Sequence, residues 1–395
     1  MRRRVFVTST GAISAVGNSV AEQLDRLWSA SPGLDQPLHL KTVHRSVFVG
    51  EVKLSNDELQ ELTGVDNKYP SRASMLACHA AMEAMEGIDK PIGKWAVVSG
   101  NTGGGMTLTE QHYKSYFKTE TPKEDFDTIQ SHHAGDSTDA IRAMFSNSGF
   151  NATISTACSS SANAIMFAAR LISIGQIDAA IAGGVDSLSA FTLNGFRSLR
   201  IMEDQRCRPF DKNRVGLNLG EAAAFVVLES EESAAKHGRK ILCELTGWAN
   251  ANDAFHETAT SPNGEGAKLA MEQALKVAKL TASDIGYINA HGTGTENNDH
   301  TEAQAITRIF GENVPPISST KGYTGHTLGA AGSLEAVYAI HAMLAGKTFA
   351  NAGLNENDPE IKWTPETKAR TVEIKHTMSN SFGFGGNATS LIFSK

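Results

Sequence analysis

Two pairs of similar segments recur along the chain at almost the same spacing. The stretch "ISTACSSSANAIMFAARLISIG" begins at Ile154, and "ISSTKGYTGHTLGAAGSLEAVYAI" begins at Ile317, 163 residues later. Each segment reads as a β run, a turn of small residues and an amphipathic helix. "GLNLGEAAAFVVLE" and "GFGGNATSLIF" likewise place Gly220 and Gly386 166 residues apart. Turns of small residues can look alike by chance, but the shared order and offset favour a duplicated architecture.

We therefore expect two similar halves, at about 1–238 and 239–395, with extra residues in the first. β-rich runs alternate with helical patterns, which indicates the α/β class with largely buried sheets. The expected strands are 4–9, 95–100, 152–156, 179–184, 222–229, 241–248, 285–290 and 390–394, and the expected helices include 75–85, 162–174, 268–279 and 333–344. Equivalent loops of two such halves can meet at one junction, where we expect the chemistry.

Charge and cysteine content disfavour several classes of protein. The 395 residues include 36 basic and 43 acidic side chains, a net charge of −7, whereas nucleic-acid binders usually carry a basic excess. The four cysteines lie far apart without a C-x-x-C pair, so neither a disulfide framework nor a zinc site is indicated. The N-terminus reads as a strand, not a signal peptide, and no segment approaches the roughly 20 apolar residues of a membrane span. We expect a cytoplasmic protein with no nucleic-acid or membrane partner.

A lone cysteine, Cys158, stands where an extended run gives way to a long apolar helix. Backbone N–H groups and the helix dipole at a helix N-terminus favour a thiolate, which is nucleophilic. A free cysteine is more commonly a small buried apolar residue. The small neighbours, Ala157 and Ser159 to Ser161, leave room for a bulky substrate and favour the nucleophile modestly.

Further candidate residues follow other strands. His291, in "NAHGTGT", lies in a glycine-flanked loop after an expected strand, where side chains often carry function. Lys321 and His326 lie in the repeat-mate of the Cys158 turn and should face it across the junction. Lys321 and Glu335 could form a buried ion pair or remain solvated surface charges, the usual state of these residues.

A glycine-rich stretch, "SNSFGFGGNATS", lies near the C-terminus. Gly385 and its neighbours permit backbone conformations that other residues avoid. The stretch lacks lysine and matches neither glycine-rich nucleotide fingerprint. An oxyanion-binding or gating loop around Phe382 and Phe384 fits it better than a phosphate loop.

Together, "TACSSS", "RPFDKNRVGLNLGEAAAFVVLE", "NAHGTGT", "SSTKGYTGHTLGAAG" and "SNSFGFGG" resemble, in order and spacing, the elongating β-ketoacyl-[acyl-carrier-protein] synthases of fatty-acid and type II polyketide synthesis. The similarity covers nearly the whole chain. It implies a thiolase-like fold, a duplicated α/β unit in five αβαβα layers, and a dimer. The implied reaction is acyl transfer to a cysteine, followed by decarboxylative condensation with a malonyl-carrier protein.

The resemblance also assigns roles to residues of this chain. Cys158 is the implied nucleophile, His291 and His326 complete a Cys-His-His set, and Lys321 with Glu335 is the supporting ion pair. The other implied site residues are two acidic supports, a gate that shares the oxyanion hole with Cys158, and substrate-binding positions: Asp299, Glu302, Phe384, Thr293, Thr295, Thr258, Thr102, Phe382 and Gly385. No metal or organic cofactor is implied.

Departures from the family pattern concern selectivity. The stretch from Ser137 to Cys158 is about six residues shorter than in the family. Thr102 stands where many fatty-acid enzymes have a bulky aliphatic side chain, and Asn387-Ala388 replaces the more usual Thr-Asn. A specialised substrate, such as a polyunsaturated or aromatic-primed chain, is therefore one hypothesis.

Neighbouring families fit less well. A coenzyme A thiolase would need a second cysteine near the C-terminus, and none follows Cys243. Chain-initiating synthases use Cys-His-Asn, whereas this chain has His326 in third place. A non-catalytic chain-length partner would lack the cysteine, but this chain could be the catalytic half of such a pair, and a cysteine hydrolase is a further alternative.

The expected partners are an acyl carrier protein and a second subunit. The subunit would be a copy of this chain, giving a homodimer, or a chain-length factor, giving a heterodimer. Carrier proteins are expected to be acidic, so binding needs a local basic surface. Lys68, Arg72, Arg206 and Arg208 are candidates, with a structural role favoured for Arg208.

Overall fold

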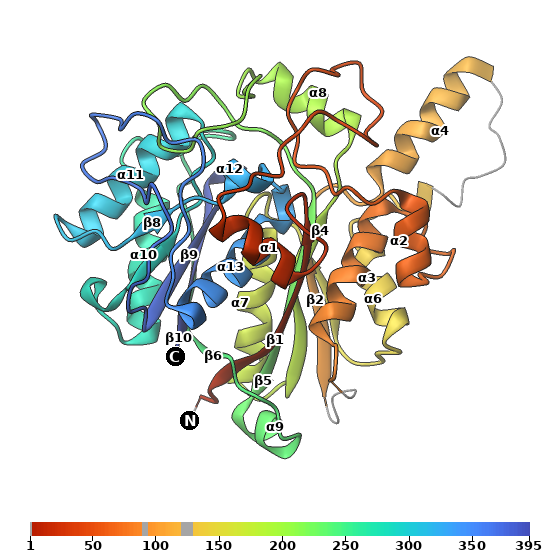
Figure 1. The fold of residues 1–395 in the computed structure, drawn as a ribbon. Coiled ribbons are helices and arrows are strands. Elements are labelled where there is room, and N and C mark those ends of the chain that lie inside the picture. Colours follow the sequence, from red (N-terminus) through yellow and green to blue (C-terminus); the bar gives the residue numbers. More distant parts are fainter. Residues whose placement is uncertain (1, 89–93, 120–128) are drawn as a thin grey trace.

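The computed structural model describes residues 2–88, 94–119 and 129–395 (Figure 1). The strands in these ranges form one sheet in the order β3-β2-β4-β5-β1-β6-β10-β9-β7-β8. Their bounds are β1 Val5–Ser14, β2 Trp95–Gly100, β3 Asn151–Ile154, β4 Ala179–Asp186, β5 Ala222–Ser230, β6 Cys243–Asn252, β7 Tyr287–Asn289, β8 Ile317–Ser318, β9 His376–Gly383 and β10 Asn387–Ser394.

The strand order repeats between the two halves of the sheet. Read inward from its outer edge, each half runs third, second, fourth, fifth and first strand of its own sequence. In each half the second strand is parallel to the third and fourth, and the fifth is antiparallel to its neighbours. The halves join where β1 pairs with β6, through Phe6 opposite Glu244 and Val7 opposite Cys243. This repetition confirms the duplicated architecture.

The helices complete five layers. The α-helices are α1 Val20–Trp28, α2 Asn56–Thr63, α3 Arg72–Ala84, α4 Met106–Thr119, α6 Asp136–Met144, α7 Ser160–Ser173, α8 Ala190–Ser198, α9 Glu231–Lys236, α10 Glu265–Ala278, α11 Glu296–Phe310, α12 Lys321–Thr324 and α13 Ala331–Ala345, with short 3-10 turns at Ala282–Asp284, Leu328–Ala330 and Phe384–Gly386. α3 packs on the outer face of the first half-sheet, and α10 packs on that of the second. α7 and α13 pack against each other between the two half-sheets (Figure 1).

The middle helices can be largely buried because they are apolar and partly built from small residues. Alanines at 162, 164, 168 and 169 of α7 are each at most 2% exposed, which lets the neighbouring backbones approach closely. Residues 328–345 are long and apolar enough to cross a membrane by length and composition, an exception to the expectation from sequence. This segment is 83% buried inside the protein and forms its central helix.

Most expected elements are present, with ends shifted by a few residues, but one strand was missed. β9 lies between β10 and β7, yet it carries Thr377, Ser379, Asn380 and Ser381, all at most 2% exposed. Its polar side chains hide the apolar alternation that predicts a strand. Pairing with both neighbours satisfies its backbone and places the glycine-rich stretch at the end of the strand.

Candidate active site

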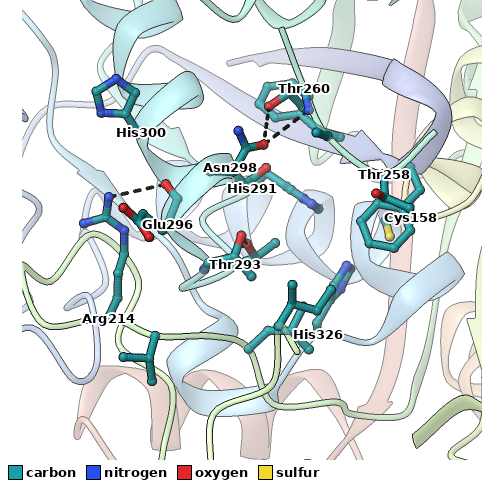
Figure 2. Close-up of a pocket in the computed structure, with 18 of the residues that line it drawn as sticks. Cys158, Arg214, Thr258, Thr260, His291, Thr293, Glu296, Asn298, His300 and His326 are labelled. Atoms are coloured by element: carbon teal, nitrogen blue, oxygen red, sulfur yellow. Dashed lines mark hydrogen bonds between the residues drawn. The ribbon is translucent and has the colours of Figure 1, made fainter. Parts of the chain in front are cut away.

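One cavity of about 990 Å³ collects side chains from both halves of the chain. Cys158 reaches it from the turn after β3, His291 from the loop after β7, and His326 from the loop after β8. These are equivalent ends of parallel strands in the repeated sheet, so the duplicated topology brings the three residues together. Figure 2 shows the rings of both histidines directed toward the side of the cavity where Cys158 lies.

The cysteine sits in a tight turn immediately before α7. Ala157 adopts φ +53°, a left-handed conformation that is uncommon for a residue with a side chain. Ser159 follows as the N-cap of α7, and Cys158 is 6% exposed. Such local strain is typical of functional turns that the surrounding structure holds in place.

The expected thiolate at this helix N-terminus is not what the structure favours. Burial raises the pKa of the Cys158 thiol to about 12, although the charge of Lys321 and the backbone N–H groups of Phe384 and Cys158 act in the opposite direction. Desolvation of the sulfur therefore outweighs the helix terminus. Burial therefore acts on the pKa of the Cys158 thiol in the direction opposite to the one expected from the helix N-terminus.

The two histidines form a pair of neutral rings. Their ring centroids lie 5.3 Å apart at an interplanar angle of 85°, and His291 also lies 5.6 Å from the ring of Phe382. Burial first, and then the charge of Lys321, hold the pKa of both imidazoles well below the usual value of 6.5. At neutral pH each ring therefore carries one N–H donor.

Lys321 belongs to a buried ion pair, which decides between the two alternatives left open by the sequence. Its Nζ contacts a carboxylate oxygen of Glu335, and both side chains are at most 3% exposed. The same Nζ donates to the carbonyl oxygen of His291 at 2.5 Å and lies 3.2 Å from its Nδ1. Because an ammonium group only donates, Nδ1 must accept, and the ring proton of His291 is on Nε2.

Two buried carboxylates hold the loop that carries His291. Glu302 accepts hydrogen bonds from the backbone N–H groups of His291 at 2.9 Å and Gly292 at 2.7 Å. Asp299 accepts from the backbone N–H groups of Gly294 and Phe210. Burial raises the pKa of Glu302 to about 7. Both acidic residues therefore fix the backbone and lie outside the cavity lining.

The glycine-rich stretch forms a loop beside the cysteine. Phe384 lines the cavity, and its ring stacks on that of Phe196 from α8 at 5.7 Å. A Cβ on Gly383 would lie 2.9 Å from the carbonyl oxygen of Thr156, so the loop touches the cysteine turn. Gly385 adopts φ +80°, as its residue type allows, but it is exposed and is not part of the lining.

The threonines expected to bind substrate divide into two groups. Thr293, Thr295 and Thr258 line the cavity, and the first two hydroxyls lie 2.9 Å apart. Thr102 is not in the lining of the single chain. Its hydroxyl donates to buried Asp186 at 2.5 Å instead.

The mouth of the cavity contains charged residues that the sequence analysis did not identify. They come from α11 and from two distant loops: Lys212, Arg214, Glu296, His300, Asp358 and Glu360. Arg214 is ion-paired with Asp358, and His300 lies 3.2 Å from a carboxylate oxygen of Glu360. Arg214 and His300 are both labelled in Figure 2. Arg214 stands inside the quoted "RPFDKNRVGLNLGE" motif, which was the available signal. For Asp358 and Glu360 the sequence offered none.

The basic candidates for carrier binding differ in accessibility. Arg72 is 7% exposed and pairs with Glu221 at 2.7 Å, so its selection as a docking residue was wrong. Arg208 contacts Glu203 at 3.3 Å, in keeping with a structural role. Lys68 and Arg206 are exposed and remain candidates. Within residues 2–88, 94–119 and 129–395, no group of three or more His, Cys, Asp or Glu side chains could hold a metal ion.

Comparison with known proteins identifies the family. The chain matches the family description "Beta-ketoacyl synthase, N-terminal domain" over residues 2–234 and "Beta-ketoacyl synthase, C-terminal domain" over residues 242–355. A 3-oxoacyl-[acyl-carrier-protein] synthase 2 of Vibrio cholerae is 33% identical over 414 residues, covering 100% of this chain and 99% of that protein.

Solved structures agree with this result. A chain of the ishigamide ketosynthase/chain length factor has a TM-score of 0.95 at 28% identity and covers 100% of both chains. A chain of the ketosynthase ApeO in complex with its chain length factor ApeC, from Xenorhabdus doucetiae, has a TM-score of 0.87 at 32% identity, covering 99% of this chain and 98% of that one. The thiolase-like fold is confirmed, and this chain belongs to the β-ketoacyl synthase family.

Proposed function

We propose that this chain is a β-ketoacyl-[acyl-carrier-protein] synthase that lengthens a carrier-bound acyl chain by two carbons. The observation that carries the proposal is the convergence of Cys158, His291 and His326 on one cavity. A cavity of about 990 Å³ is at the upper end of the range for substrate pockets, which suits a long acyl chain with its pantetheine arm. The chemistry needs neither a metal nor an organic cofactor.

In the first half-reaction the sulfur of Cys158 attacks the thioester carbonyl of an acyl-carrier protein. The C–S bond to the carrier breaks, and the proton of the Cys158 thiol ends on the departing carrier thiol. This step releases no net proton, which suits a buried thiol whose pKa is raised to about 12. Backbone N–H groups of Cys158 and Phe384 stabilise the oxyanion, and removal of one such donor elsewhere costs roughly 2.7–4 kcal/mol.

In the second half-reaction a malonyl-carrier protein enters and its carboxylate leaves as carbon dioxide. The electron pair of the broken C–C bond makes an enolate, whose negative charge gathers on the thioester oxygen. Nε2–H of His291 and the N–H of His326 donate to this oxygen, because both rings are neutral. The enolate carbon attacks the acyl-enzyme, and the Cys158 thiolate departs and takes up one proton.

Lys321 prepares His291 for that role. Its ammonium group donates a hydrogen bond to Nδ1 of His291. The ring proton is therefore on Nε2, where it can be donated to the substrate. Glu335 balances the buried charge of Lys321. Threonines 293 and 295 line the same cavity as the cysteine and are suited to hold the polar pantetheine arm.

A second candidate is the catalytic half of a heterodimer with a non-catalytic chain-length partner. It is favoured by the structural similarity to two ketosynthase/chain length factor complexes. In the described part of the chain, β3 is the edge of the sheet and pairs only with β2. Its four residues are half-buried, and nearby Phe150 is 45% exposed, so this edge is suited to a second subunit. We expect either dimer to work with an acyl carrier protein in the cytoplasm.

The test is a reconstituted condensation with purified chain, an acyl-carrier protein and a malonyl-carrier protein. We expect one carbon dioxide and one β-ketoacyl-carrier product, two carbons longer, per turnover, and no product with Cys158→Ala. Free acid in place of the longer product would identify a hydrolase. Activity that appears only after addition of a chain-length factor would select the heterodimer, whereas an active homodimer would remove that requirement.

A further inference from the structure

Asn387 and Ala388 follow the last glycine of the glycine-rich stretch. Asn387 is the first residue of β10 and directly follows the glycine-rich loop that carries Phe384. Its side-chain oxygen Oδ1 accepts from three donors: Ser159 Oγ at 2.6 Å, Asn163 Nδ2 at 2.9 Å and Asn250 Nδ2 at 2.7 Å. One amide thus connects the loop, the cysteine turn and β6.

The donors around Asn387 form a continuous polar network between the halves of the chain. Asn163 Nδ2 also donates to Thr156 Oγ1 at 2.9 Å, and Asn163 Oδ1 accepts from Thr389 Oγ1 at 2.8 Å. Thr156 and Ser159 flank Cys158, Asn163 lies on α7, and Thr389 lies two residues after Asn387. The network therefore links the residues on either side of Cys158 to the first residues of β10.

Ser159, the N-cap of α7, belongs to this network and makes no side-chain capping bond. The side chain of an N-cap serine usually accepts a hydrogen bond from the backbone of the helix it caps. Ser159 makes no such bond, although Ser19, Ser55 and Ser71 do so at α1, α2 and α3. Its hydroxyl is instead directed to the carbonyl oxygen of Thr156 and to Asn387. The single hydroxyl proton of Ser159 is therefore shared between a local acceptor and an acceptor across the junction.

We propose that Asn387 is a positioning residue that sets the separation between the backbone N–H groups of Cys158 and Phe384. The inference rests on the proposed function, in which those two groups stabilise the oxyanion. The glycine-rich loop already touches the cysteine turn at Gly383, where a Cβ would lie 3.1 Å from the nitrogen of Cys158. Asn387 fixes the other end of the same loop to Ser159, one residue beyond the cysteine.

A threonine at this position would not do the same. Its hydroxyl oxygen is one bond from Cβ, whereas the amide oxygen of asparagine is two bonds away, so the reach is shorter. We therefore expect the acyl-transfer rate to fall in the order wild type, Asn387→Thr, Asn387→Ala. Thr246→Val is the matched control. It breaks a side-chain contact of 2.7 Å between Thr246 of β6 and Ser394 of β10, at the opposite end of the strand pair from Asn387.

The experiment compares two reactions of the same sulfur. Single-turnover acyl transfer from an acyl-carrier thioester develops an oxyanion, whereas alkylation by iodoacetamide does not. For Asn387→Ala we expect the single-turnover rate constant of acyl transfer to fall roughly 10- to 100-fold, in line with the cost of misplaced reacting groups. In steady-state turnover the loss should appear in kcat and not in KM. Alkylation should fall less than acyl transfer, because the two N–H groups act on alkylation only through the pKa of the thiol and stabilise no oxyanion there.

Several outcomes would overturn the inference. These are unchanged acyl transfer in Asn387→Ala, a parallel fall in alkylation and acyl transfer, or the same loss in Thr246→Val. If the alanine variant does not fold, the inference is tested with Asn387→Thr alone, by the ratio of its acyl-transfer rate to its alkylation rate. Wild-type protein that is alkylated but never acylated would contradict the proposed function instead, so the two failures are distinguishable.

Discussion

Replacement of Glu335 by alanine is the sharpest perturbation of the buried charges behind the cavity. Lys321 is 1% exposed, and without Glu335 its ammonium group would keep only the carbonyl oxygen and Nδ1 of His291 as acceptors. Both are neutral groups. Removal of one partner from a buried ion pair leaves an uncompensated charge and costs about 3–5 kcal/mol.

The matched control removes the acid of an exposed pair. Glu272 lies 2.6 Å from Lys268 on α10, and its side chain is 43% exposed. Because solvent screens such a pair, Glu272→Ala should cost only about 0.3–0.5 kcal/mol. Glu335→Gln keeps an acceptor oxygen for Lys321 and should fall between the two alanine variants.

The assay is urea-induced unfolding, with the transition midpoint and slope fitted for each variant. We expect Glu335→Ala to lower the midpoint far more than Glu272→Ala, and to lower the rate of malonyl decarboxylation because His291 loses its fixed orientation. Equal midpoint shifts for the two alanine variants would refute the reasoning, since they would mean that Lys321 is solvated or paired elsewhere.

Three further predictions follow from the site. The rate of Cys158 alkylation by iodoacetamide should rise about tenfold per pH unit from about pH 7 to 10, because a thiol with its pKa raised to about 12 gains thiolate throughout that range; a plateau below pH 9 would contradict this. Arg72→Ala should destabilise the protein by about 3–5 kcal/mol because Glu221 is left buried and unpaired, whereas exposed Lys68→Ala should stay within about 0.5 kcal/mol, and equal unfolding midpoints would contradict the burial argument. His326→Ala should still accept an acyl group but release carbon dioxide from malonyl-carrier protein more slowly, and unchanged release would remove that residue from the second half-reaction.

The fold was predictable where the pattern of apolar and small residues in the sequence is itself what determines the local structure. The repeat offset located equivalent turns, and those turns end equivalent strands of the repeated sheet. Alternation and helical periodicity placed α3, α7, α10 and α13 to within a few residues. β9 escaped because it is buried through polar residues, which are held by backbone pairing on both edges and not by an apolar face.

The site was predictable as a set of residues and much less as a set of charge states. Motif order brought Cys158 and both histidines together, but the raised pKa of the Cys158 thiol depends on how completely the fold excludes water. The partner of Arg72 lies 149 residues away along the chain, so its burial could not be inferred from neighbouring residues. Thr102 was expected in the lining because of its motif, whereas its hydroxyl is bound to Asp186.

The residues at the mouth of the cavity show the same limit. Asp358 comes from a loop without regular structure, lines the cavity and pairs there with Arg214. The separation of such partners along the chain carries no periodic signal. Asn387 was visible in the sequence beside the glycine-rich stretch, but its three donors come from segments that meet only in the folded protein.

Peptide mapping of the trapped acyl-enzyme tests the central claim most directly. The protein is mixed with an acyl-carrier thioester, and the reaction is quenched before or after a chase with malonyl-carrier protein. The protein is then digested, and the peptide masses are measured by mass spectrometry. We expect the acyl mass on the peptide that contains Cys158, and its disappearance during the chase as the longer product forms. An acyl group on Cys78, Cys207 or Cys243, or one on Cys158 that malonyl-carrier protein does not remove, would contradict the account.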